Sequence, residues 1–290
     1  MFTLTLIAAG LFNGAIYALM ALGLVLVYKT QDMVNFAHGE MFMAGAYLGY
    51  TIYQISGWPY PVAFVLAMAL SGLLGALIEL ITIRPIANHP HVTLTMVTVG
   101  VSYAMKGVVR LLFGGDILSM PAVAGNATLT VGGVPVSPQG VLNICVAVVL
   151  TVCLLVLFQK TSLGKQIRAT QQNPRGARVI GIDTGRIYAL TWALAAMMGA
   201  AAGFLAAPVT LVYPDMGTRF LLKVIAAAVL GGFGSVGGAI CGGLAIGVIE
   251  TLAGGYLSTK LLDVSSYLVI IVVMMVRPQG LFGQASTARV

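Results

Sequence analysis

Long apolar stretches separated by short polar segments run along most of the chain. They lie at residues 4–28, 41–55, 61–83, 92–113, 140–158, 188–212, 221–253 and 264–276. Most approach or exceed the ~20 residues that a helix needs to cross a hydrocarbon layer ~30 Å thick. The two-residue alternation of a membrane β-strand is missing from them. The pattern predicts an all-α, polytopic transmembrane protein with about eight or nine membrane segments in a single domain over residues 1–290.

The composition supports a membrane environment. Of the 290 residues, 59% are hydrophobic and 8% are charged, against about 25% charged in soluble domains.

Other features exclude several classes of protein. The first cation is Lys29, after the first apolar stretch, whereas a cleaved signal peptide opens with cations, so we do not expect the N-terminus to be such a peptide. The chain has a net charge of +7, but its sequence has no basic patch with aromatic residues interleaved, so nucleic-acid binding is not expected. The three cysteines have no ligand spacing, and we predict neither a metal site nor a cofactor.

Cations set the expected orientation. The loop at residues 159–187 is the densest in cations and carries six of the 15 Lys and Arg residues, namely Lys160, Lys165, Arg168, Arg175, Arg178 and Arg186. Because loops rich in Lys and Arg stay in the cytoplasm, this loop is predicted to be cytoplasmic. Counting crossings from it puts the N-terminus and an external loop at residues 114–139 outside, and the C-terminus inside.

The stretch at residues 221–253 is too long for one crossing. Its ~33 residues would make ~50 Å of helix at 1.5 Å per residue. It is also interrupted by the glycine-rich segment 231–238. We expect it to enter and return, as a re-entrant half-helix or a tight two-crossing hairpin. Irregular backbone is costly in lipid, so the glycine segment should be buried in protein or line a wet cavity. We expect a close-packed, water-accessible turn with no room for a side chain at Gly234.

A second irregular segment carries Asn35, His38 and Glu40, before an apolar stretch at 41–55 that is short for a crossing. Either the membrane thins there, or the helix begins below the membrane surface. In the second case Asn35 would be its N-cap, and the positive helix end would face inward. Interrupted segments in the two halves of a transporter point to its substrate pathway.

Ionisable residues inside membrane segments are functional candidates, although each has a structural alternative. Glu79 is expected to pair with Arg84, and Lys106 and Arg110 to extend to the interface. The small residues near 199–207 and 237–247 favour helix packing over ligand contact. Our candidates for the translocation pathway are Asn35, His38, Glu40, Lys223, Gly234, Ser235 and Glu250.

No catalytic motif emerges from the sequence. A glycine-rich loop ending in Gly-Lys-Ser/Thr is missing, so the chain is not expected to hydrolyse ATP. Ser235 lacks a nucleophile elbow, and nothing in the spacing joins it to His38. We predict a transport protein and not an enzyme. A passive channel remains an alternative, because a wet, glycine-lined path would serve either purpose.

The cytoplasmic loop contains a short helix with recognisable ends. Pro174 suits the first turn of a helix at residues 175–180, and Gly181 suits its C-terminal cap. A stiff basic helix between two crossings offers a surface for another protein, although a solvated basic loop is an alternative. The candidate coupling residues are Arg168, Pro174, Arg175, Arg178 and Gly181.

Four segments, spread over most of the chain, carry a family resemblance. They are NGAIYALMALGLVLVYKTQDMVNFAHGEMFMAGAY, IRATQQNPRGARVIGIDTGRIYALTWALAAMMGAAAGFLAAP, LLKVIAAAVLGGFGSVGGAICGGLAIGVIET and RPQGLFG. The chain resembles the inner-membrane permeases of branched-chain amino acid ABC importers, the LivH type. The resemblance implies ATP-powered import of leucine, isoleucine and valine. Urea or short-chain amides are alternative substrates, since related permeases carry them.

The resemblance also implies partners. A periplasmic binding protein would deliver the substrate, two ATP-binding subunits would sit on the cytoplasmic side, and a second, LivM-like permease would complete the pore. Membrane lipid would surround the assembly. Within the loop at 159–187, residues 174–181 would dock on an ATP-binding subunit.

Overall fold

The computed structural model describes residues 1–290 except 124, 126–127, 132–133 and 284–290. The described part is almost entirely helical, which confirms the predicted fold class. Its elements are α1 (Phe2–Gln31), α2 (His38–Gly49) with a π-helical extension (Tyr50–Ile55), α3 (Tyr60–Ile78) with further helical turns (Glu79–Ile83 and Arg84–Ile86), α4 (His91–Phe113), β1 (Leu129–Val131), β2 (Val134–Val136), α5 (Pro138–Lys160), α6 (Ser162–Gln172), α7 (Pro174–Val179), α8 (Thr184–Thr210), α9 (Met216–Gly231), α10 (Val236–Tyr256) and α11 (Leu261–Val276).

Six helical segments in the described part are long and apolar enough to cross a membrane. They are α1, α3 with its helical extension, α4, α5, α8 and α10. Residues 264–276 of α11 form a shorter apolar helix, and α2 and α9 are not among the six. The total of eight or nine membrane segments therefore stays a prediction.

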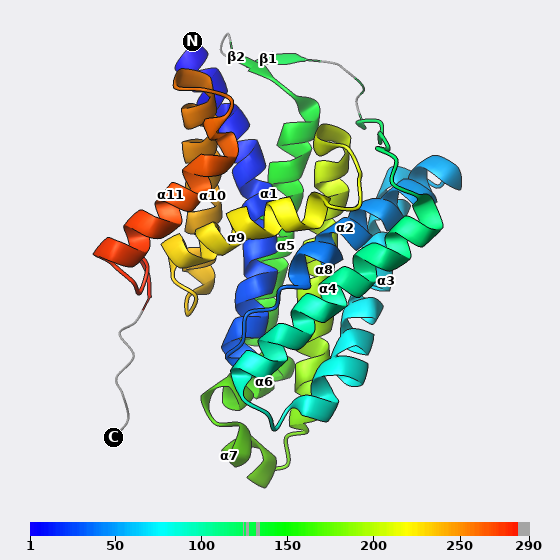
Figure 1. Ribbon diagram of the computed structural model, residues 1–290, viewed down its shortest axis with the longest axis vertical. Coiled ribbons are helices and arrows are strands. Elements are labelled where there is room, and N and C mark those ends of the chain that lie inside the picture. Colours follow the sequence, from blue (N-terminus) through cyan, green and yellow to red (C-terminus); the bar gives the residue numbers. More distant parts are fainter. Residues whose placement is uncertain (124, 126–127, 132–133, 284–290) are drawn as a thin grey trace.

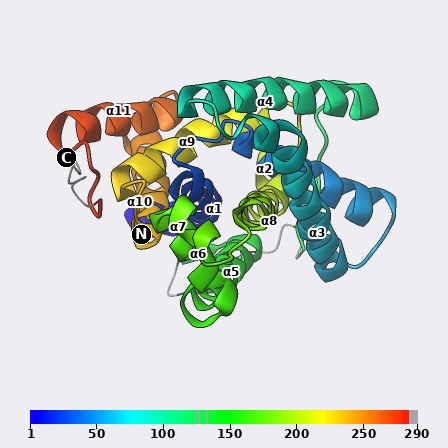
Figure 2. The ribbon, with the colours of Figure 1, turned by 90° about the horizontal axis from the view of Figure 1, so that it is seen from below.

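α1 is the central helix of the bundle. Viewed from below, it is surrounded by α5, α8, α9 and α10, while α4 and α11 lie along one edge (Figure 2). α1 and α10 approach closely because their contact is made of small residues. A Cβ on Gly14 would lie 2.8 Å from Leu244 Cα, and one on Gly247 would collide with the backbone of Gly10 and Gly14. Small residues let helix backbones approach in membranes, as predicted for residues 237–247.

α2 packs against α8 in the same way. A Cβ on Gly45 would collide with the Ala200 backbone, and one on Gly203 with the carbonyl of Phe42. Large side chains such as Phe42 and Phe204 fill the neighbouring core and are fully buried. The small residues predicted to pack near 199–207 therefore do so, and they hold the start of α2 deep in the bundle.

The molecule has two distinct ends (Figure 1). The N-terminus and the β1–β2 hairpin, an antiparallel pair inside the predicted external loop, lie at one end, called here the hairpin face. Helices α6 and α7 lie at the other end, called the basic face. Arg84 belongs to the basic face, since its Nη2 donates to the carbonyl of Gly185, 2.9 Å away. Arg84 also pairs with Glu79 at 2.9 Å, as predicted.

Candidate functional site

The irregular segment before α2 is held by its own side chains. Oδ1 of Asn35 accepts a hydrogen bond from the backbone N–H of Ala37 at 2.9 Å. Ala37 is the N-cap of α2, and its side chain makes no cap hydrogen bond. The prediction that Asn35 is the N-cap is therefore wrong by two positions. The reason is that an Asn side chain can also fold the chain locally by bonding two residues ahead, before the helix begins.

The Glu40 carboxylate joins three helices. It is 1% exposed, and its Oε1 accepts from Ser102 of α4 at 3.0 Å and from Thr218 of α9 at 3.3 Å. Lys106 Nζ of α4 lies 3.5 Å from the same oxygen. The prediction that Lys106 extends to the interface is wrong, because a buried carboxylate lies within its reach. Arg110 pairs instead with Asp215, 2.7 Å away at the start of α9.

The first turns of α2 and α9 meet beside Glu40. A Cβ on Gly39 would lie 2.5 Å from the carbonyl oxygen of Gly217, so the two turns are in direct backbone contact. Because each helix N-terminus carries a partial positive charge, the Glu40 carboxylate is stabilised by both ends. The polar segment therefore faces the start of α9 and not the glycine-rich segment at its far end.

His38 ties α2 to α1. The ring is fully buried, and its Nε2–H donates to the carbonyl of Met20 at 2.9 Å. Its Nδ1 has no hydrogen-bond partner among the described residues. Gly23 and Gly199 make room for the ring, since a Cβ on Gly23 would lie 2.6 Å from its Cε1. This hydrogen bond supports the packing of α2 against α1. Ser235 is not part of the contact, because it lies at the start of α10.

A second buried charge pair lies between α9 and α10. Lys223 Nζ pairs with Oε1 of Glu250, and Tyr17 of α1 donates to the other carboxylate oxygen at 2.7 Å. The Lys223 ammonium also lies 5.8 Å from the centre of the Tyr17 ring and 5.9 Å from that of Phe220. This group borders a cavity of about 270 Å³. The sequence singled out Lys223 and Glu250 separately, and the structure brings them together.

The glycine-rich segment forms the turn between α9 and α10, and its tight places are not where we expected them. A Cβ on Gly234 would meet no atom within 4 Å, so the expectation of a close-packed Gly234 is wrong. Gly231 and Gly238 are crowded because a Cβ on either would collide with the backbone of the other, and a Cβ on Gly232 would lie 2.7 Å from the backbone nitrogen of Gly283. Ser235 caps α10 by accepting from the N–H of Gly238 at 3.0 Å.

The same turn lies beside the C-terminal segment and the end of α1. The N–H of Leu281 donates to the carbonyl of Leu230 at 2.8 Å, and residues 28–29 and 278–283 help to line a cavity of about 730 Å³ there. Gly234 and Ser235 border this cavity. The cavity beside the turn is thus compatible with the predicted access of water to Gly234 and Ser235.

Helix α7 has the ends that the sequence predicted. Pro174 is its first residue, and Asn173 caps it by accepting from Gly176 N–H at 2.9 Å. Gly181 has a φ of +86°, and the N–H groups of Gly181 and Ile182 donate back to Arg178 and Ala177 at 3.0 and 2.9 Å. This is the Schellman arrangement that ends many helices. The short helix is therefore fixed at both ends.

Two of the coupling candidates, Arg168 and Arg178, donate hydrogen bonds within the loop, although the Arg178 side chain is itself exposed. Arg168 donates to the carbonyl of Phe158, and Arg178 Nε donates to Thr184 at 2.8 Å, so both brace the loop. Arg175 is exposed. Sequence reasoning missed Val179 and Ile180, which are 86% and 72% exposed at the end of α7. Two exposed aliphatic side chains next to basic residues are typical of a protein contact.

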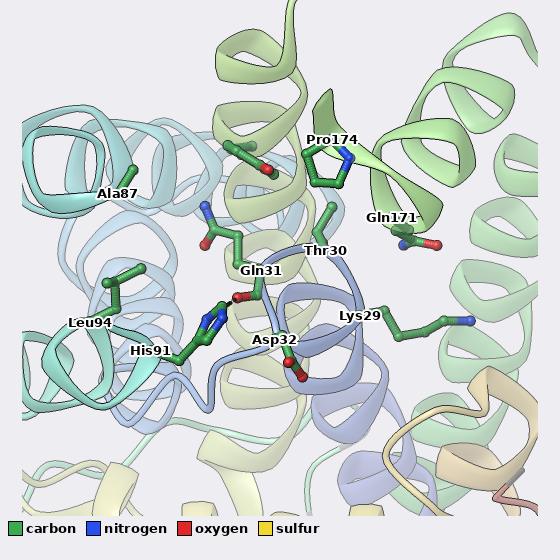
Figure 3. A pocket seen from close by; sticks show the side chains of 10 residues that line it. Lys29, Thr30, Gln31, Asp32, Ala87, His91, Leu94, Gln171 and Pro174 are labelled. Carbon is green, nitrogen blue, oxygen red and sulfur yellow. Dashed lines mark hydrogen bonds between the residues drawn. The ribbon is translucent and has the colours of Figure 1, made fainter. Parts of the chain in front are cut away.

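A cavity of about 270 Å³ lies behind α7, lined by Pro174, Gln171 and the end of α1 (Figure 3). Gln31 at that end joins two other helices. Its side-chain oxygen accepts from Trp192 of α8 at 2.7 Å. Its carbonyl lies 3.1 Å from His91 Nδ1 of α4 (Figure 3). The base of α7 therefore borders a junction of α1, α4 and α8. No group of three metal-binding side chains occurs in the described part of the chain.

Residues 6–276 match the family described as "Branched-chain amino acid transport system / permease component". The chain belongs to this family. It is 32% identical to the high-affinity branched-chain amino acid transport system permease protein LivH of Escherichia coli K12, over 97% of this chain and 96% of that protein. It is 29% identical to the BraD permease protein of Pseudomonas aeruginosa, with the same coverage. A probable LivH of Methanocaldococcus jannaschii is 29% identical over 91% of this chain and 88% of its own.

One solved structure supports the fold. PsaBC from Streptococcus pneumoniae, in complex with Fab, matches with a TM-score of 0.51 at 11% identity, over 93% of this chain and 91% of that one. This likeness extends to the fold alone. The described chain is thus a multi-pass helical permease of the branched-chain amino acid transport family.

Proposed function

We propose that the chain is the permease subunit of an ATP-powered importer for leucine, isoleucine and valine in the inner membrane. The observation that carries this function is the family match over residues 6–276, together with the two permeases named above. The chain itself would not be an enzyme, because ATP hydrolysis would belong to two partner ATP-binding subunits. A periplasmic binding protein would deliver the substrate, and a second, LivM-like permease would complete the pore.

The loop at residues 159–187 would couple this permease to an ATP-binding subunit through α7. Both ends of α7 are capped, so a push on it is transmitted to its neighbours and is not lost in unwinding. Val179 and Ile180 supply the exposed apolar contact and Arg175 a cation. The basic face would then be cytoplasmic and the hairpin face, with the N-terminus, outside. The cation asymmetry between the two faces supports this orientation.

The translocation pathway would follow the buried polar groups. It would pass the α2–α9 junction and the Lys223–Glu250 pair on its way from the hairpin face to the turn on the basic face. Charged groups are expensive inside a membrane and are retained there mainly where a path or a binding site uses them. The proposed pathway residues are Asn35, His38, Glu40, Lys223, Glu250, Gly234 and Ser235.

Reconstitution of the two permeases and the two ATP-binding subunits in liposomes, with the binding protein added, tests the function. Labelled leucine should accumulate only with ATP, the binding protein and both ATP-binding subunits present. Leucine uptake through this chain without the ATP-binding subunits would favour a passive channel. Competition by urea or acetamide, with no effect of valine, would move the substrate to the amide class.

Substitutions in α7 test the coupling. Val179→Asp and Ile180→Asp should weaken binding of the ATP-binding subunits and reduce substrate-stimulated ATP hydrolysis, because a charge would enter an apolar contact. Ile117→Asp is the matched control, since Ile117 is 68% exposed in the loop before β1. Equal effects of the α7 variants and the control would refute a docking role for α7.

A further inference from the structure

The buried Lys223–Glu250 pair borders a cavity between α1, α8, α9, α10 and α11. The rim includes Asn13 of α1, Thr210 at the end of α8 and Leu262 at the start of α11. The end of α8 and the start of α11 lie in the half of the molecule that carries the β1–β2 hairpin (Figure 1). A solute that arrives at the hairpin face would therefore meet this cavity before it reached the basic face.

The charge pair is hard to explain as a stabilising contact. Removing two charges from water costs several kcal/mol per ion, and replacing such a pair with apolar residues is often neutral or stabilising. Lys223 and Glu250 are 8% and 5% exposed, and the small exposed fraction lies beside the cavity. Ionisable residues at such depth are expected to serve a ligand or a path.

The cavity wall combines this charge pair and the exposed Arg219 side chain with apolar surface. Ile16, Val209, Phe220 and Leu262 border the same space of about 270 Å³. That volume is about nine times the ~30 Å³ that a water molecule occupies in the liquid. It is also just below the ~300–1,000 Å³ of pockets that hold drug-sized ligands. The site suits a small molecule with opposite charges at one end and an aliphatic group at the other.

We infer that this cavity binds an aliphatic α-amino acid as its zwitterion. The Lys223 ammonium would contact the substrate carboxylate, and the Glu250 carboxylate would contact the substrate ammonium. Tyr17 donates to Glu250 and so fixes the direction of the carboxylate. Lys223 would exchange the Glu250 carboxylate for the substrate carboxylate, and Glu250 would exchange the Lys223 ammonium for the substrate ammonium. Neither buried charge would then be left uncompensated. The aliphatic side chain would lie against Ile16 and Val209.

This inference rests on the proposed transport function and adds a binding site within the permease itself. Recognition would not depend on the binding protein alone. A ligand with only one of the two charges could replace only one member of the Lys223–Glu250 pair. The site should therefore discriminate against leucine analogues that lack either charged group.

Thiol labelling at the rim tests the site. Thr210→Cys is introduced into a chain whose native Cys145, Cys153 and Cys241 are replaced by serine, and the complete importer is reconstituted. Leucine at about ten times its dissociation constant should slow labelling from the hairpin side about tenfold, since the unoccupied fraction falls as 1/(1 + [L]/Kd). Ser137→Cys, exposed just after the hairpin, should be labelled at the same rate with and without leucine.

The chemistry is tested with two analogues and two variants. 4-Methylpentanoate lacks the ammonium and leucinamide lacks the carboxylate, so neither should protect Thr210→Cys at the same concentration. Lys223→Gln should abolish protection by leucine. Arg84→Gln, which breaks an ion pair at the basic face, should leave protection unchanged. The analogue comparison uses the native pair, so it remains valid even if Lys223→Gln does not fold.

The outcomes separate this inference from the transport function. ATP-dependent leucine uptake without any protection at Thr210→Cys would refute the site and leave the transport function standing. Equal protection by leucine and either analogue would refute zwitterion recognition. Absence of leucine uptake in the unsubstituted importer would instead refute the proposed function.

Discussion

The contact between α1 and α10 makes a quantitative prediction possible for Gly14→Ala. The added Cβ would lie 2.8 Å from Leu244 Cα and 3.0 Å from the Leu244 carbonyl oxygen. Both atoms belong to the backbone, so no side chain can turn away. Ordinary contact begins near 3.4 Å, and the helices must separate by about 0.6 Å. A gap of that size forfeits about a quarter to a half of each dispersion contact across the interface.

Such overpacking typically costs about 1–3 kcal/mol. Alanine recovers roughly 0.5–1 kcal/mol through its better helix propensity. Gly107→Ala is the matched control, because Gly107 lies inside α4 and its Cβ would meet no atom within 4 Å. The gain in propensity is common to both variants. Gly14→Ala should therefore be less stable than Gly107→Ala by about 1–3 kcal/mol.

Unfolding of the purified permease by SDS in detergent micelles measures this difference. The fluorescence of Trp192, which is fully buried in α8, can follow the transition. The free energy of unfolding should fall for Gly14→Ala and stay level or rise for Gly107→Ala. Equal unfolding free energies for the two variants would refute the close packing of α1 and α10.

Three further predictions concern the polar groups, the turn and the orientation. Lys106→Met would leave the Glu40 charge without its cation, and losing one partner of a buried pair costs about 3–5 kcal/mol. The melting temperature of the variant should therefore drop, and an unchanged melting temperature would show that the pair does not stabilise the fold. Gly231→Leu should abolish uptake and Gly234→Leu should be far milder, because only Gly231 is crowded; the reverse order, measured with inserted protein, would contradict this. Arg175→Cys, with the native cysteines replaced, should escape impermeant thiol reagents in intact cells, and its labelling would reverse the proposed orientation.

Local signals in the sequence predicted much of this structure. The break at residues 231–238 and both ends of α7 follow from glycine and proline, whose backbone preferences act without tertiary context. The pairing of Glu79 with Arg84 was predictable because the two are five residues apart at a helix end. The helical class followed from the apolar stretches alone.

The polar contacts between distant helices were not predictable in the same way. Lys106 has the sequence context of an interfacial cation, and only the approach of α2 to α4 gives it Glu40. Gly234 and Gly231 belong to one glycine run, and only the path of α10 decides which of them is crowded. The exposed Val179 and Ile180 resemble other aliphatic residues of the chain until the fold leaves them uncovered.

The junction at Glu40 has a consequence for the order of assembly during synthesis. Glu40 and Thr218 are 178 residues apart, which takes roughly 10 to 40 s at ~5–20 residues per second. Lys223 and Glu250 are 27 residues apart and emerge within about 1–5 s of each other. The α9–α10 pair can thus compensate its charges as one hairpin while it enters the membrane. The start of α2 must wait for the last third of the chain, so the bundle closes around Glu40 only after about three quarters of the 290 residues have been made.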